Sequence, residues 1–466
     1  MNREATRMIH FVGFAGHRRV MDPAAALRSI KRELERFRES CDGELAGIAS
    51  AAAGADLLFL EACAELGLKT VVILPFGKER FREDFEDPAE WTRACRTMDA
   101  AWWLETAQGG EPAPEAYHVV AREVLEVADR MVFLWDGQPA RGLGGTAESI
   151  AEAKEHGIPS RVINANTLEA DWLDRVPQAG ARHPSFEDLP EAAGVAELFE
   201  LLDERAGRGA PRSRGFAAAS LSLNHLAGVT QAVMVAFSVL TAQAGALLKL
   251  VLVTVASVLP KVGKKLRWQQ QWVNDRVRAE LLRSLLATHE PCSPLYPPAL
   301  ELFGREREFL RSASMRLVPE RKGWQPARDR YLTERLDGQI RYLKSKGDLA
   351  GKRMRIFGRI FAAASLGAVI LGAAVVILTF MGLRPWDSVS FAADVLPGVA
   401  AWLLAMISVF EFKRRATLYH QMVRELERVR PVIASARCAS EVVRGMRQAE
   451  RLLLNELWEW RGSREK

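Results

Sequence analysis

The run from Ile360 to Leu383 carries no formally charged side chain. A transmembrane α-helix needs about 20 predominantly apolar residues, because each residue adds 1.5 Å and the hydrocarbon core is about 30 Å thick. The run is long enough to meet that requirement. The alternative for such a segment is one arm of a hydrophobic helical hairpin inside a large soluble core. Its length without charge favours the bilayer.

A second apolar run follows after a short connection, and together the two runs predict a transmembrane helical hairpin. Val395 to Phe410 is uncharged, and we expect its helix to extend backwards through "VSFAAD". Basic clusters lie before the first run ("KRMRIFGR") and after the second, at Lys413–Arg415. Because basic flanks stay in the cytoplasm, we expect a protein of the inner (cytoplasmic) membrane with both termini in the cytoplasm and the Arg384–Ser388 connection outside.

A third apolar region, Phe216 to Pro260, contains Lys249 as its only formal charge. Three structures fit this region: a membrane hairpin, a single amphipathic element in the plane of the membrane, or a buried hairpin of a soluble domain. Basic residues flank it on both sides, which favours a hairpin that returns to the cytosol.

The N-terminal third alternates short apolar runs with amphipathic stretches, which is the pattern of an α/β domain. We expect a Rossmann-like parallel sheet with helices on both faces, followed by an all-α membrane-associated domain. The expected strands are 8–14, 44–50, 69–76, 130–137 and 159–164, and the expected helices are 23–37, 55–67 and 115–129. The expected limits are 1–165 for the sheet domain, 166–215 for a linker, 216–328 for a helical region that is a candidate for membrane association and 329–466 for the transmembrane domain.

Composition argues against several other classes. The net charge is +6, from nearly equal numbers of basic and acidic residues, and no basic stretch is interleaved with aromatic residues, so direct binding of nucleic acid is not expected. The five cysteines are scattered, without a CxxC pair, which fits reduced thiols rather than a disulfide framework. The eight histidines show no metal-ligand spacing, so no metal site is expected. The N-terminus lacks the apolar core of a signal peptide.

Three loops are expected at one edge of the sheet, because the carboxyl ends of parallel strands meet there. "GFAGHRR" combines glycines, which let a ligand approach the backbone, with basic side chains for phosphate; a tight turn with solvated charges is the alternative. "SAAAGAD" leads into a helix whose first amides can bind an anion, although its aspartate can also be a helix cap. "GGTAE" opens another helix after an aspartate at a strand end. The predicted binding residues are Gly13, Gly16, His17, Arg18, Ser50, Gly54, Asp56, Asp136, Gly144, Gly145, Thr146 and Glu148.

Residues 8–164 resemble the SLOG group of Rossmann-like domains, which includes the LOG phosphoribohydrolases and the DNA-processing protein DprA. The Gly-Gly-x-Gly-Thr-x-x-Glu theme of that group is echoed from Gly144 to Glu148, and its Ser-Gly-x-Ala-x-Gly-x-Asp theme from Ser50 to Asp56. The hydrolases place two residues between threonine and glutamate, whereas this chain has one. Their complete catalytic pattern is also not matched. The resemblance therefore implies nucleotide binding and favours binding over hydrolysis.

Residues from about Asp329 to Trp460 resemble the SLATT domains, two-helix membrane effectors that occur with SLOG domains. This resemblance rests on the helical architecture. A chain that joins the two parts implies a prokaryotic conflict or antiphage protein. Its soluble domain would sense a nucleotide-derived messenger, and its membrane part would form a pore or disrupt the membrane.

Three functions remain open at this point. The first is a ligand-gated membrane effector, with a nucleotide or cyclic nucleotide as messenger, the lipid bilayer as partner and a homo-oligomer as the active form, because two spans cannot enclose a channel alone. The second is a membrane-anchored nucleotide N-glycosidase or phosphoribohydrolase, in which Glu148 would support charge at the ribose. The third is a passive membrane anchor. We expect the first, with no catalytic residue and no resident cofactor.

Overall fold

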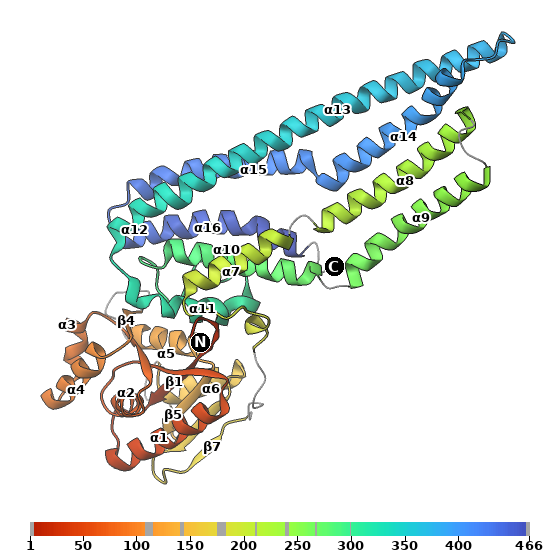
Figure 1. Cartoon of the computed structure of the whole chain (residues 1–466). Helices are drawn as coiled ribbons and strands as arrows, with labels where there is room; N and C mark the ends of the chain where they lie inside the picture. The colour runs from red at the N-terminus through yellow and green to blue at the C-terminus, as the bar shows by residue number, and fades with distance from the viewer. Residues whose placement is uncertain are drawn as a thin grey trace. The chain divides into compact units, whose positions relative to one another are not determined.

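The chain folds into two units. The computed structural model describes residues 4–107, 115–139, 144–174, 183–209, 212–237, 242–265, 268–298 and 300–462. One unit comprises Met1–Leu198 and Cys292–Arg321, and the other comprises Phe199–Pro291 and Lys322–Lys466. The first contains the sheet and the second is helical (Figure 1).

The sheet has seven strands in the order β4-β3-β2-β1-β5-β6-β7. The first six of these are parallel to one another, and β7 runs antiparallel to β6. The sequence did not predict β4 or β7, because three or four residues at a sheet edge are too few to show an alternating pattern. The strands are β1 Met8–Gly16, β2 Gly43–Ala49, β3 Lys69–Leu74, β4 Trp103–Thr106, β5 Arg130–Trp135, β6 Ser160–Asn164 and β7 Ala170–Trp172.

Helices cover both faces of the sheet, as neighbouring strand residues show. Phe11 and Val12 lie in different core clusters, and so do Val71 and Val72, because successive side chains of a strand point to opposite faces. The α/β parallel fold expected from the sequence is confirmed. The helices of this unit are α1 Pro23–Ser40, α2 Ala55–Glu65, α3 Lys78–Phe81, α4 Pro88–Asp99, α5 Glu115–Val127, α6 Thr146–Glu155 and α11 Arg307–Arg316, and α7 Val195–Gly209 leads from this unit into the next.

The segment Cys292–Arg321 returns to the sheet domain after a long excursion through the helical unit. Ser312 Oγ accepts a hydrogen bond from Ile9 N on β1 at 3.0 Å, and Arg311 Nη1 donates to Val127 O at 3.0 Å. Leu295 and Met315 are fully buried in the core beneath the sheet. The sheet domain is thus built from two separate stretches of chain, whereas the sequence had suggested one helical region over 216–328.

The helical unit consists of long helices joined by short turns. Its elements are α8 Arg212–Phe237, α9 Ala242–Lys265, α10 Trp268–Thr288, α12 Trp324–Arg330, a π-helical turn Tyr331–Leu336, α13 Asp337–Phe380, α14 Asp387–Phe410, α15 Phe412–Ala434 and α16 Ala439–Gly462.

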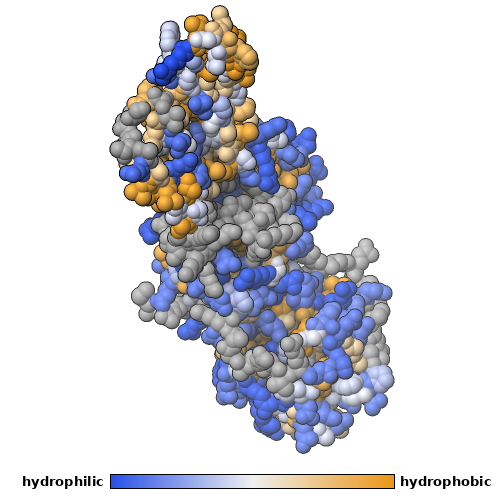
Figure 2. All heavy atoms as spheres, turned by 90° about the vertical axis from the view of Figure 1, so that its right-hand side faces the viewer, coloured by the Kyte–Doolittle hydropathy of each residue, from blue (hydrophilic) through white to orange (hydrophobic). Residues whose placement is uncertain are grey.

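Helices α13 and α14 form a long hairpin (Figure 1). Both helical stretches, Trp324–Phe380 and Asp387–Ala434, are long and apolar enough to cross a membrane. Only 6% of the most apolar window of the first is buried, so this helix does not pack as a core element of a soluble protein. Exposed side chains include Val369, Ile370 and Ile377. Figure 2 shows hydrophobic side chains gathered at the end of the helical unit. The all-helical region with two long apolar helices is therefore confirmed.

Helices α8 and α9 form a second hairpin, and α8 lies along α14. Trp402 Nε1 donates to Ser222 Oγ at 3.1 Å, and the ring of His225 stacks on that of Trp402 with centroids 5.9 Å apart. The opposite face of this hairpin is open, since Leu247, Leu250, Val251 and Val255 of α9 are all exposed. Such exposure does not fit a buried soluble hairpin.

The charged end of the helical unit is organised around the buried carboxylate of Glu450 on α16. Arg335 binds it in a bidentate pair, Nε to Oε1 at 3.0 Å and Nη2 to Oε2 at 2.7 Å, and the Tyr331 hydroxyl donates to Oε1 at 3.0 Å. Burial alone would raise the pKa of Glu450, but attraction and hydrogen bonding from Arg335 outweigh it and the pKa is lowered. The π-helical turn therefore presents Tyr331 and Arg335 to one carboxylate.

We predict that Glu450→Ala destabilises the helical unit by about 3–5 kcal/mol, because it leaves the buried Arg335 guanidinium without its counter-charge. Thermal denaturation of the full chain in detergent measures the effect. Glu425→Ala is the matched control, because Glu425 pairs with Arg428 at the surface and should matter little. Equal denaturation midpoints for the two variants would contradict the role assigned to the buried pair.

Candidate functional site

The strand order creates a crevice between β1 and β5. From β1 the chain steps outward through β2, β3 and β4, and then returns to place β5 on the other side of β1. The loops after β1 and β5 therefore leave the sheet in opposite directions, which is where parallel α/β sheets bind ligands. A cavity of about 630 Å³ opens at this point and is lined by both loops.

Most of the residues predicted from the loops line this cavity. They are Gly16, His17, Arg18, Ser50, Asp56, Asp136, Gly144, Gly145 and Thr146. The structure thus brings together three loops that are far apart in the sequence. Helix α6 begins at Thr146 with Gly145 as its N-cap, and α2 begins at Ala55 with Gly54 as its N-cap, so neither Thr146 nor Asp56 is the capping residue.

Gly13, Gly54 and Glu148 are not among the lining residues, and each has a structural contact instead. A Cβ on Gly13 would lie 2.2 Å from the Met131 sulfur, so this glycine lets β1 pack against β5. Gly54 has φ +85°, and a Cβ there would lie 2.1 Å from the Arg18 carbonyl oxygen. The Glu148 carboxylate accepts a hydrogen bond from Gly144 N at 2.7 Å. These residues shape the loops around the cavity.

His17 and Asp136 join the two loops across the crevice. His17 Nε2 lies 2.9 Å from Asp136 N and 3.1 Å from Asp136 Oδ1. An unprotonated Nε2 accepts from the amide, and a protonated Nε2 donates to the carboxylate. In either state the imidazole ties the loop after β1 to the end of β5.

Aromatic side chains supply part of the wall, and the sequence analysis missed them. Tyr117 on α5 lies under Arg18, whose guanidinium carbon is 5.4 Å from the ring centroid, and Trp135 ends β5. The Tyr117 hydroxyl donates to Asp84, and burial together with this carboxylate raises the pKa of Tyr117. Tyr117 lies on an amphipathic helix, where an aromatic residue is usually interpreted as part of the hydrophobic core. Its place in the cavity wall follows only from the arrangement of the strands and helices.

The charges in the cavity are mixed. Arg18 and Arg19 are exposed at its rim. The N-cap of α6, Gly145, has no side chain to bind the first amides of the helix, which leaves them for an anion. Asp56 and Asp136 lie in the same wall as acceptors. This combination suits a ligand with phosphate groups and hydroxyl groups, and the apolar Val120, Val124 and Leu134 provide surface for a ring.

Asp56 is the most perturbed of the lining carboxyls. Burial raises its pKa to about 8, and Arg18 with hydrogen bonds from the backbone of Gly16 and Ala52 opposes the shift only in part. A carboxyl that is neutral near pH 7 can donate a hydrogen bond to a ligand and does not repel phosphate.

A second cavity, of about 450 Å³, lies between α8 and α14 in the helical unit. Asn224 and His225 of α8 line it together with Asp394 and Trp402 of α14. Placing polar or ionisable side chains of a membrane-spanning helix against lipid costs free energy. In membrane proteins such side chains therefore face protein or water.

Comparison with known families bears on the helical unit. Residues 331–460 match the family model of the SMODS and SLOG-associating 2TM effector domain 1. The match begins at the π-helical turn, includes the α13–α14 hairpin and ends within α16. It supports the SLATT part of the resemblance and indicates a membrane location. The SLOG part rests on the loop motifs and the Rossmann-like sheet. No curated protein matches the chain.

We predict that Asp56→Asn stabilises the sheet domain increasingly as the pH rises from about 4 to about 8. The folded-state pKa of about 8 lies above the ordinary aspartate value of 3.8, so the folded state holds a proton that the unfolded state has lost, and wild-type stability falls across this window. Thermal denaturation at several pH values measures the difference. Asp22→Asn is the control, because Asp22 lies at the exposed start of α1. It measures the effect of the same substitution at the start of a different helix. A difference between Asp56→Asn and wild type that is constant with pH would refute the assignment.

Proposed function

We propose that the protein is a membrane effector controlled by a nucleotide-derived messenger, which binds in the cavity between β1 and β5. The observation that carries the proposal is the pairing on one chain of this cavity with a 2TM effector match. By its family description the effector domain associates with SLOG domains, and the loop motifs of the sheet domain resemble that group. We place the protein in prokaryotic antiphage or conflict defence.

The cavity accounts for each part of a nucleotide. The guanidinium groups of Arg18 and Arg19 and the first amides of α6 bind phosphate oxygens. Asp136 accepts from ribose hydroxyls, and Asp56 either accepts or donates there, depending on its protonation. The base lies against the apolar wall and Tyr117, because purine and pyrimidine rings stack on aromatic side chains.

Binding is favoured over hydrolysis by the placement of Glu148. A phosphoribohydrolase of the alternative mechanism would need this carboxylate at the ribose. Instead one oxygen accepts from Gly144 N at 2.7 Å, and the residue is absent from the cavity lining. Its role in this proposal is to hold the glycine loop in shape.

The helical unit responds if the ligand prefers one of two states of the assembly. Converting a mostly closed population to a mostly open one requires a preference of about 5.5 kcal/mol. Two spans do not enclose a pore, so several copies of the chain must assemble. The polar groups of the cavity between α8 and α14 then face a neighbouring copy or a water-filled path, since Asp394 and Asn224 are exposed in one copy.

We predict that a nucleotide messenger bound by the full-length protein binds at least about tenfold more weakly to Gly145→Trp and to the double variant Arg18→Ala, Thr146→Ala. The indole would fill the cavity, and the double variant removes a guanidinium and a hydroxyl from its wall. Calorimetry with a panel of nucleotides, cyclic nucleotides and dinucleotides measures affinity. In vesicles that contain a trapped dye, the same ligand should release dye with wild type and not with the variants.

The matched control is Arg28→Ala, which removes an exposed arginine on α1 away from the cavity and should leave both signals unchanged. Undiminished affinity in folded Gly145→Trp protein would reject the binding site. Release of free base that depends on Glu148 would instead favour the hydrolase.

We predict that a cysteine at Ser388, in a background without the five native cysteines, reacts with a membrane-impermeant reagent applied to intact cells. The basic residues before Ile360 and after Phe410 hold those ends inside, so the short connection between α13 and α14 must lie outside. A cysteine at Ser435, just after α15, is the control and should react only after the cells are broken. The opposite labelling pattern would reverse the orientation.

A further inference from the structure

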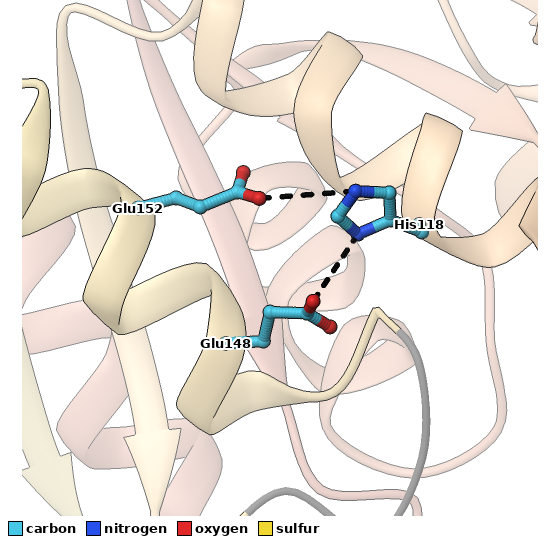
Figure 3. A group of neighbouring side chains, drawn as sticks. All are labelled: His118, Glu148 and Glu152. Atoms are coloured by element: carbon cyan, nitrogen blue, oxygen red, sulfur yellow. Dashed lines mark ion pairs between the residues drawn. The ribbon is translucent and has the colours of Figure 1, made fainter.

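His118, Glu148 and Glu152 form a compact cluster beside the glycine loop of the sheet domain (Figure 3). His118 belongs to α5, and the two glutamates lie one turn apart on α6. One nitrogen or oxygen of each residue lies within 4.8 Å of the others. Among the described residues this is the group of histidine, cysteine and acidic side chains that has the geometry to hold a metal ion.

The histidine has a carboxylate opposite each ring nitrogen. Nδ1 lies 3.7 Å from Glu148 Oε1, and Nε2 lies 3.8 Å from Glu152 Oε1. Both separations are too long for hydrogen bonds. A neutral imidazole has one nitrogen lone pair, which would then face a negative oxygen without a proton between them. A single ion takes only one of the two ring nitrogens, so one carboxylate must turn toward the nitrogen that the other already faces.

We propose that this cluster binds a divalent transition-metal ion, with Zn²⁺ and Mn²⁺ as the representative ions. One imidazole nitrogen and two carboxylates are a mixed nitrogen and oxygen set of the kind these ions take. Ligand atoms around an ion with bonds of about 2.0–2.2 Å lie roughly 3–3.5 Å apart, so donor atoms that are now up to 4.8 Å apart must approach one another by about 1.3–1.8 Å. The side chains are between 24% and 33% exposed, which leaves room for rotation and for water or another oxygen ligand to complete the coordination.

The site is connected to the glycine loop through Glu148. The oxygen Oε1 faces His118, while Oε2 accepts the hydrogen bond from Gly144 N. Gly144 has φ +74°, and a Cβ there would lie 2.7 Å from His118 N, so the loop packs directly on the backbone of α5. An ion between α5 and α6 would therefore stabilise the loop that lines the cavity. The ion would be bound by the three side chains alone, so the metal-site proposal does not depend on the proposed messenger.

We expect the full-length protein in detergent, after treatment with a chelator and dialysis, to bind one Zn²⁺ or Mn²⁺ ion in calorimetry. His118→Ala and Glu152→Gln should each weaken binding by at least about tenfold, because even second-shell changes at metal sites cost 10–100-fold. The ion should also raise the denaturation midpoint of wild type and not that of the variants. Glu148 is left unchanged, since it also holds Gly144.

Two matched controls lie on the same helix or just beyond its end. Glu155→Gln and His156→Ala change exposed residues that are not in the cluster, and they should bind the ion like wild type. Glu152→Gln keeps the size of the side chain, so it tests the site even where His118→Ala does not fold. Circular dichroism checks that each variant is folded. Absence of binding to wild type, or equal binding to wild type and both cluster variants, would overturn the site and would leave the nucleotide proposal untouched.

Discussion

The exposed apolar side chains of α13 and α14 need an apolar solvent, and this requirement governs the whole chain. In water these surfaces would aggregate, because burial of apolar surface stabilises by roughly 25 cal/mol per Å². The backbone in a bilayer must also satisfy its own hydrogen bonds, which α-helices do. The helical unit is therefore long helices and short turns where it meets lipid, and its buried ion pair between Glu450 and Arg335 lies at the other end.

The sheet domain obeys a different constraint, since its strand order decides where a ligand can bind. Only between β1 and β5 do the loops diverge, so residues from the β1, β2 and β5 turns meet there. The glycines of the site mainly determine the conformation and packing of the loops. Gly13 and Gly54 permit close packing between neighbouring segments, and Gly144 lets its loop rest on α5.

Regular patterns made much of this fold predictable from sequence. The apolar run from Ile360 and the alternation of strands and helices predicted the two halves. Short edge strands such as β4 lacked such a pattern, and the return of 292–321 to the sheet depends on contacts between residues far apart in the sequence, such as Ser312 with Ile9 N. The turn residues of the site were predictable because strand ends share an edge. Tyr117 and the His118 cluster were not, since their partners lie on other elements that are distant in the sequence.

Helix α13 connects the two ends of the helical unit. It is a single helix of 44 residues, so at 1.5 Å per residue it spans about 66 Å without a break. Its start follows the π-helical turn bound to Glu450, and Asp337 in its first turn holds Arg430 of α15 in a bidentate pair. A displacement of this end would move the N-terminal turns of α13, which continue without interruption into the hairpin with α14. Because α13 packs on α14 and α14 packs on α8, such a movement would reach the cavity that His225 and Asp394 line.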